Sequence, residues 1–237
     1  MNISIGKAIG FAAAAAVLSS LITVAVLKQE LVAIKEPVAV GSKTPSAEKV
    51  EETRTPAPEI NIEAAMADRV IGSDDAPVTI IEYASMTCDH CAAFHNQALP
   101  EVKKELIETG KARLIYRDMP WDKFALKGSK MARCAPAEKY FEVLETIFKT
   151  QEHWAHSPDP LKGLVDIGLA AGMEEKYLQA CLDSDPLETA ILQKQQEGRQ
   201  VYEVKGTPAF IFMKGGEKQG SYPEFEEIFK RLGEHKH

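Results

Sequence analysis

The sequence lacks the signatures of several large classes of protein. Its 237 residues carry a net charge of −7 and contain no block rich in lysine and arginine, which argues against a nucleic-acid partner. It has no internal repeat and no glycine-rich loop of the kind that holds nucleotide phosphates. The hydrophobic fraction of 45% and the charged fraction of 27% are ordinary, so most of the chain is expected to fold.

Charge is also absent from one long stretch near the N-terminus, residues 8–27, which lies between Lys7 and Lys28. Twenty helical residues span about 30 Å, the thickness of the hydrocarbon core of a bilayer. Its small residues lie inside the apolar run and no good cleavage site follows, so we interpret it as an uncleaved membrane anchor. The alternative is a cleaved signal peptide. Under either interpretation the remainder of the chain is exported.

Within the next segment, residues 29–62, the stretch 36–62 contains few large apolar side chains and is rich in proline, glutamate, threonine, lysine and alanine. Such a composition cannot bury enough surface to order itself, so this segment is interpreted as a flexible linker. Residues 63–237 are expected to form the folded domain.

The pattern of apolar residues predicts an α/β fold for that domain. Residues 76–85, APVTIIEYAS, have the continuous β-branched run of a strand that is covered on both faces. Helical spacing follows over 89–109, and 112–119 reads as a second strand. Strand, helix and strand in this order predict a βαβ unit and therefore a sheet with a parallel part.

The rest of the domain predicts a helical block inserted between two halves of the sheet. Residues from about 124 to 203 show several helical segments and no convincing strand. Residues 207–222 then read as a hairpin that turns at two adjacent glycines, and a last helix is expected from Glu224 to about Leu232.

Two cysteines three positions apart, Cys88 and Cys91, lie where the first strand ends and the helix begins. A sulfur at a helix N-terminus lies near unpaired backbone N–H groups and the positive end of the helix dipole, which favour the reactive thiolate. Cys91, one turn further on, is expected to face inward and to act as the resolving partner. His90 between them would add positive charge or a hydrogen bond to the Cys88 sulfur. The pattern therefore favours redox chemistry.

Two other readings of this motif are open. Zinc binding would need four ligands, and the helix offers the two cysteines and, as a third, His95. An inert structural disulfide at the start of the helix is the second alternative. We expect no metal and no other cofactor.

Two distant features fit a redox site. Glu82 lies within the apolar strand, where it is either a buried proton acceptor for Cys91 or an exposed residue at the strand end. In GTPAF, Thr207 and Pro208 form a candidate cis peptide bond directly before an apolar strand. Such a turn would offer the Thr207 backbone to an extended substrate; an ordinary trans turn is the alternative.

APVTIIEYASMTCDHC, the helical insertion and VKGTPAF together resemble the DsbA family of exported thiol:disulfide oxidoreductases. The resemblance covers about residues 65–235 and implies a thioredoxin-like fold with an inserted helical domain. It implies that Cys88 is the nucleophile, Cys91 the resolving cysteine and His90 the stabiliser of the thiolate. Thr207 and Pro208 would form the substrate-binding turn, and Glu82 falls where the family carries a buried acid.

One residue departs from that family pattern. Many members have proline after the first cysteine, where this chain has Asp89. A carboxylate at the helix start competes for the same dipole and repels the Cys88 anion. We therefore expect Asp89 to raise the pKa of Cys88 and to make the pair less oxidising than with proline.

The remaining cysteines, Cys134 and Cys181, both fall in the helical insertion. In an oxidising compartment they are natural partners for a structural disulfide. Two free buried thiols are the alternative. A subgroup of the DsbA family with a second disulfide in this region has a similar ARCA and ACL context.

We expect an oxidase that passes a disulfide to reduced, unfolded substrate proteins in the periplasm. The resemblance implies reoxidation by a quinone-linked membrane partner of the DsbB type, with residues 8–27 holding the protein in the inner membrane or, after cleavage, leaving it soluble. A reductase or isomerase with the same residues is the nearest alternative. A non-catalytic peptide-binding or chaperone module is another.

Overall fold

The computed structural model describes residues 58–222 and residue 230. The predicted anchor at 8–27, the linker up to residue 57 and the predicted helix from Glu224 to Leu232 lie outside the described residues, apart from residue 230. Residues 58–222 all fall in one unit, Thr53–His237. Within the part described, no helix combines the length and the apolar character needed to cross a membrane.

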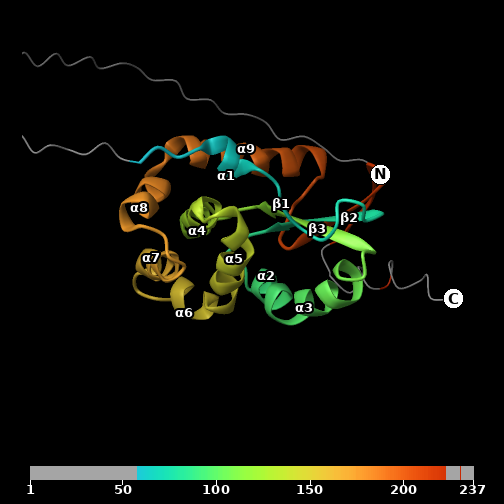
Figure 1. Cartoon of the computed structure of the whole chain (residues 1–237), viewed down its shortest axis with the longest axis horizontal. Helices are drawn as coiled ribbons and strands as arrows, with labels where there is room; N and C mark the ends of the chain where they lie inside the picture. Colours follow the sequence, from blue (N-terminus) through green and yellow to red (C-terminus); the bar gives the residue numbers. More distant parts are fainter. Residues whose placement is uncertain (1–57, 223–229, 231–237) are drawn as a thin grey trace, which may run out of the picture. The chain divides into compact units, whose positions relative to one another are not determined.

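In the described part of the chain, five strands form one mixed sheet in the order β1-β3-β2-β4-β5. Strands β1, β2 and β3 are labelled in Figure 1. Strands β2 and β3 run parallel, whereas β1 pairs antiparallel with β3, β4 with β2, and β5 with β4. This places the strand that leads to the cysteine pair in the centre of the sheet. The strands are β1 (Arg69–Ile71), β2 (Val78–Ala84), β3 (Ala112–Asp118), β4 (Ala209–Lys214) and β5 (Glu217–Tyr222).

The crossover from β2 to β3 differs from the regular helix predicted over 89–109. It alternates α-helical and π-helical turns. Pro100 lies in the middle of the crossover, and its lack of an N–H and its ring disturb the regular ladder of helical hydrogen bonds. The segments are α2 (Asp89–Ala93), η1 (Phe94–Ala98), α3 (Leu99–Val102) and η2 (Lys103–Ile107).

A block of helices separates β3 from β4, and Figure 1 shows α4 to α8 grouped to one side of the sheet. This arrangement confirms the predicted α/β fold with an inserted helical domain. A short helix, α1 (Ile62–Met66), precedes the sheet. The inserted segments are α4 (Lys123–Cys134), η3 (Ala137–Lys139), α5 (Tyr140–Lys149), α6 (Gln151–Ala155), α7 (Pro160–Ala170), α8 (Glu175–Asp183) and α9 (Asp185–Val201).

Both faces of β2 are covered, as its continuous apolar run predicts. Ile80 packs with the crossover helix, and Ile81 and Tyr83 pack in a separate cluster on the opposite face. Helix α9 approaches that opposite face closely at Gly198. A Cβ atom there would lie 2.5 Å from the Tyr83 ring, so only glycine permits this approach.

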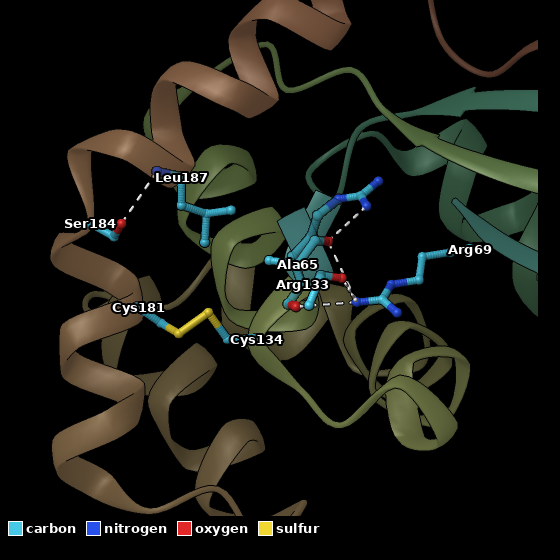
Figure 2. The surroundings of a disulfide bond; sticks show 8 residues. Ala65, Arg69, Arg133, Cys134, Cys181, Ser184 and Leu187 are labelled. Atoms are coloured by element: carbon cyan, nitrogen blue, oxygen red, sulfur yellow. Dashed lines mark hydrogen bonds between the residues drawn. A yellow bond between two sulfur atoms is a disulfide. The ribbon is translucent and has the colours of Figure 1, made fainter. Parts of the chain in front are cut away.

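A disulfide joins two helices of the insertion (Figure 2). Cys134, at the end of α4, is bonded to Cys181 of α8, with their Cα atoms 6.3 Å apart. Both cysteines are buried in the core of the helical block. The alternative of two free thiols does not describe this structure.

Next to this disulfide, an ion pair fastens α4 to the sheet. The Arg133 Nε donates to Asp118 Oδ2 at 2.5 Å, and both side chains are buried. The same guanidinium donates to the Ala65 carbonyl of α1, as does Arg69, and Figure 2 shows both arginines converging there. Because a buried charge without a partner is costly, this network fixes the position of α4 against the end of β3.

Candidate active site

Cys88 is the N-cap residue of α2. Its backbone is extended, with φ −87° and ψ 118°, and no side chain caps the helix there. The turn that follows β2 is closed by a hydrogen bond from the Cys88 N–H to the Ser85 carbonyl oxygen at 3.1 Å. The backbone N–H groups of His90 and Cys91 face the half-buried sulfur and favour its thiolate form. The first turn of the helix therefore solvates the sulfur.

These contacts make Cys88 an acidic thiol. Its pKa falls from an ordinary 9.0 to about 5, and the largest cause is a hydrogen bond from the side chain of Cys91. A hydrogen bond with Thr207 and the two backbone N–H groups lower the pKa further, while partial burial opposes them. At pH 7 a thiol of pKa 5 is about 99% ionised, against about 1% for one of pKa 9.

Cys91 has the opposite character. Its side chain is fully buried, and burial raises the pKa of its thiol, with further contributions from the neighbouring Cys88 sulfur and from Glu82. Both cysteines are free thiols in the structure. One sulfur is thus a half-buried, acidic nucleophile and the other a buried thiol that must release a proton before it reacts.

The turn before β4 meets the cysteine pair. The Thr207–Pro208 peptide bond is cis. The Cys88 Sγ lies 3.3 Å from the Thr207 carbonyl oxygen, to which its thiol form donates. Two segments 119 residues apart in the sequence therefore form one site.

Trp121 belongs to the same site, although its sequence context does not reveal it. Its indole Nε1 donates to the Thr207 hydroxyl at 2.8 Å, and the Arg199 guanidinium lies 4.8 Å from the centre of its ring. The indole leaves the proton of the Thr207 hydroxyl free to point elsewhere, including toward Cys88. Its contact with Thr207 spans 86 residues, so local pattern could not predict it.

Glu82 is fully buried in the central strand, between Tyr116 of β3 and Phe210 of β4. The alternative of an exposed residue at the strand end is therefore wrong. Its Oε1 lies 3.0 Å from Nε2 of His95, which is also buried. In the residues described, no three His, Cys, Asp or Glu side chains are arranged to hold a metal ion.

The side chains of Asp89 and His90 are both exposed. His90, for which the family resemblance implies stabilisation of the thiolate, acts on the Cys88 sulfur through its backbone N–H. Asp89 occupies the first position of α2, directly after the sulfur. Its carboxylate therefore lies at the end of the helix where the thiolate forms.

We expect Asp89→Pro to lower the pKa of Cys88. The substitution removes a negative charge from the first turn, and proline is compatible with the first helical position because its N–H is not needed there. Titration of the thiolate absorbance in both proteins measures the change, with Asp75→Asn, on an exposed loop outside the site, as a control for net charge. An unchanged or higher pKa in the proline variant would contradict the expectation.

Alkylation of Cys88 by iodoacetamide is expected to be nearly independent of pH above pH 6 and to fall to half near pH 5. The free energy of unfolding of the reduced protein should also depend on pH through Cys88. Between about pH 5 and the ordinary thiol pKa of 9, the folded state binds fewer protons at Cys88 than the unfolded state, so the free energy of unfolding rises with pH. Comparison with Cys88→Ser across this range measures the contribution, which disappears below pH 5. A reactivity that still rises steeply between pH 7 and 9 would contradict it.

Comparison with known proteins agrees with this geometry. The family model described as thioredoxin matches residues 64–230. The chain belongs to the thioredoxin family. Among solved structures, the Wolbachia pipientis protein alpha-DsbA1 superposes on this thioredoxin-family chain with a TM-score of 0.64 at 25% identity, covering 71% of this chain and 90% of that one. The chain is accordingly a DsbA-like member of the family, as its motifs predict.

Curated relatives of this DsbA-like protein carry related names. A protein of Rickettsia conorii, named as a candidate protein-disulfide oxidoreductase, is 29% identical over 180 residues, which are 76% of this chain and 64% of the relative. Disulfide bond formation protein D of Bacillus subtilis is 24% identical over 171 residues, which are 68% of this chain and 75% of that protein. The chain thus spans less than two thirds of the rickettsial relative.

Proposed function

We propose that this DsbA-like protein is an exported thiol:disulfide oxidoreductase that passes a disulfide between Cys88 and Cys91 to folding proteins. The observation that carries the proposal is the contrast between the two sulfurs: an acidic Cys88 thiol at the N-cap of α2 and a buried Cys91 thiol of raised pKa. Stabilising the Cys88 thiolate stabilises the reduced form, so the disulfide is a better oxidant. The names of the relatives support the same class of reaction.

In the proposed reaction, a substrate thiolate attacks the Cys88 sulfur of the disulfide. The bond between Cys88 and Cys91 breaks, and the Cys91 sulfur leaves with the electron pair and takes up a proton. A second substrate thiolate then attacks the substrate sulfur of the mixed disulfide, and Cys88 leaves as a thiolate. The substrate is oxidised by two electrons and the cysteine pair is reduced by two.

Thr207 and Pro208 are the proposed contact for the substrate backbone. The Thr207 carbonyl lies beside the Cys88 sulfur, and Pro208 has no N–H of its own to compete for an acceptor. An extended, unfolded segment could therefore hydrogen-bond here while its cysteine reaches the sulfur. For reoxidation we propose a quinone-linked membrane protein of the DsbB type, which a membrane anchor at residues 8–27 would hold nearby in the periplasm.

A glutathione redox titration of the full chain, combined with refolding of a reduced substrate protein, tests the proposal. We expect an oxidising equilibrium potential and stoichiometric transfer of one disulfide per molecule. A strongly reducing potential without net oxidation of the substrate would favour a reductase. Preferential rearrangement of an already oxidised, wrongly paired substrate would favour an isomerase.

A further inference from the structure

The buried carboxyl group of Glu82 has a specific partner. Its Oε1 lies 3.0 Å from Nε2 of His95, and the exposed fractions of the two side chains are 0% and 1%. Glu82 is on β2 and His95 is on η1, so the contact joins the central strand to the crossover helix that begins at Cys88.

The surroundings of this pair are aromatic. The His95 ring stacks on Phe148 of α5, with 4.1 Å between ring centres and 22° between planes. The edges of Phe94 and Tyr116 complete the enclosure. In such surroundings a carboxylate without a partner costs several kcal/mol and takes up a proton instead. A hydrogen bond between the carboxyl group and the imidazole lowers the cost of burying both groups.

Each side chain of the pair has a second polar atom that takes no part in the hydrogen bond between them. Glu82 Oε2 and His95 Nδ1 are buried and have no hydrogen-bond partner among the described residues. Since Oε1 is held by the imidazole, Oε2 is the oxygen that remains able to exchange a proton.

Cys91 is the group in this region whose thiol has to release and regain a proton during disulfide exchange. It lies one helical turn before His95, and the charge of Glu82 is one of the causes that raise the pKa of its thiol. The other titratable groups facing this region are Tyr116 from β3 and Tyr140 from α5, which also respond to Glu82 and, beyond it, to the Asp118–Arg133 pair. Both phenols remain protonated at neutral pH because burial raises their pKa values.

We propose that His95 is a positioning residue for disulfide exchange: it holds Oε1 of Glu82 and keeps this buried carboxyl able to accept and return the proton of Cys91 at Oε2. The inference rests on the proposed function and adds to it a residue for which the cysteine motif alone gives no role. Through Glu82, His95 sets the pH range in which the buried sulfur reacts.

When Cys91 attacks a mixed disulfide on Cys88, its thiol proton passes to the Glu82–His95 pair, a bond forms between the two cysteine sulfurs, and the other partner leaves as a thiolate. In the opposite direction the Cys91 sulfur leaves with the electron pair and the proton returns to it. The pair gains one positive charge with this proton and the departing thiolate carries one negative charge, so charge is conserved over the step.

The experiment uses the full-length protein with a mixed disulfide between Cys88 and glutathione, and follows the release of glutathione by Cys91 from pH 5 to 9. His95→Leu removes the hydrogen bond and keeps an apolar side chain of similar volume, while His95→Gln keeps an N–H donor for Oε1. His156→Gln is the matched control, because His156 is exposed and pairs with Glu152 on a surface helix. Glu82→Gln and the double variant with His95→Leu complete a cycle.

We expect His95→Leu to slow the release about tenfold or more at pH 7 and to shift its acid limb to higher pH, while the pKa of Cys88 and the control are unchanged. His95→Gln should recover much of the rate, although glutamine packs less well than leucine among aromatic rings. The double variant should be no slower than Glu82→Gln alone. A pH profile of His95→Leu that matches the unmodified protein, or multiplying effects in the double variant, would overturn the proposal.

A measurement without substitution at His95 keeps the test independent of folding. The ring-nitrogen NMR shifts of His95 are expected to differ between the dithiol and the disulfide forms, and to lose this difference in Glu82→Gln. Equal shifts in both forms would reject the role of His95. Failure of the unmodified protein to form or resolve the mixed disulfide would instead reject the proposed function.

Discussion

Cys88→Ser is expected to reduce disulfide transfer to the rate of the uncatalysed reaction in buffer. A serine hydroxyl is not ionised at neutral pH and cannot form the disulfide that the substrate attacks, so both the nucleophile and the donated bond are lost. The measurement is refolding of a reduced substrate protein with a glutathione buffer as the terminal oxidant. A non-catalytic peptide-binding module would keep its function in this variant, so retained activity would exclude the oxidoreductase proposal.

Cys91→Ser is the matched control for this experiment. It keeps the Cys88 thiol at the N-cap of α2, and the serine hydroxyl can still donate the hydrogen bond that contributes most to the low pKa of Cys88. We expect this variant to accumulate a mixed disulfide with substrate, because Cys88 can still be joined to a substrate sulfur while the resolving thiol is missing. Absence of such a complex would argue that Cys88 is not the sulfur that is joined to the substrate.

Removal of the second disulfide, in Cys134→Ala/Cys181→Ala, is expected to lower the free energy of unfolding by about 4 kcal/mol. The bridge closes a loop with a sequence separation of 47, and in the chain-entropy model its loss gives the unfolded chain that much additional freedom. This is a large share of the roughly 5–15 kcal/mol that stabilises a typical domain. Urea denaturation of both proteins, with Cys88 and Cys91 oxidised, measures the difference.

The same variant separates stability from reactivity. The bridge joins α4 to α8 in the core of the helical block, while the site is positioned by β2, α2 and the turn before β4. The pKa of Cys88 is therefore expected to stay near 5 under conditions where the variant is folded. A decrease of less than about 1 kcal/mol in the free energy of unfolding would show that the packing of the helical block, rather than the covalent bond, holds these helices together.

Elements with a repeating apolar pattern could be predicted from the sequence, and short ones could not. The run VTIIEY identifies the central strand, and the motif TCDHC after it identifies the helix start that carries the reactive sulfur. Strand β1 has only three residues, too few for a periodic signal, and is defined by its pairing with β3. The π-helical turns around Pro100 depend on how the crossover packs, which spacing alone does not report.

Contacts between distant segments also limit how much of the site can be predicted from the sequence. The motifs indicate Cys88, Cys91, Glu82 and Thr207 separately, because each stands in a recognisable local pattern. The imidazole that holds Glu82 and the indole that holds the Thr207 hydroxyl carry no such signal. Histidine and tryptophan are common in cores and loops, and their partners are identified only once the chain is folded.

Helix α2 begins without a capping serine, threonine, asparagine or aspartate, and the Cys88 sulfur occupies that place. As an anion the sulfur accepts from the first amides of the helix, whereas a sulfur bonded to its neighbour is a poor acceptor. The start of this helix is therefore well satisfied in one oxidation state and under-satisfied in the other. Transfer of the disulfide to a substrate therefore gives the first amides of α2 an acceptor, and reoxidation of the cysteine pair removes it.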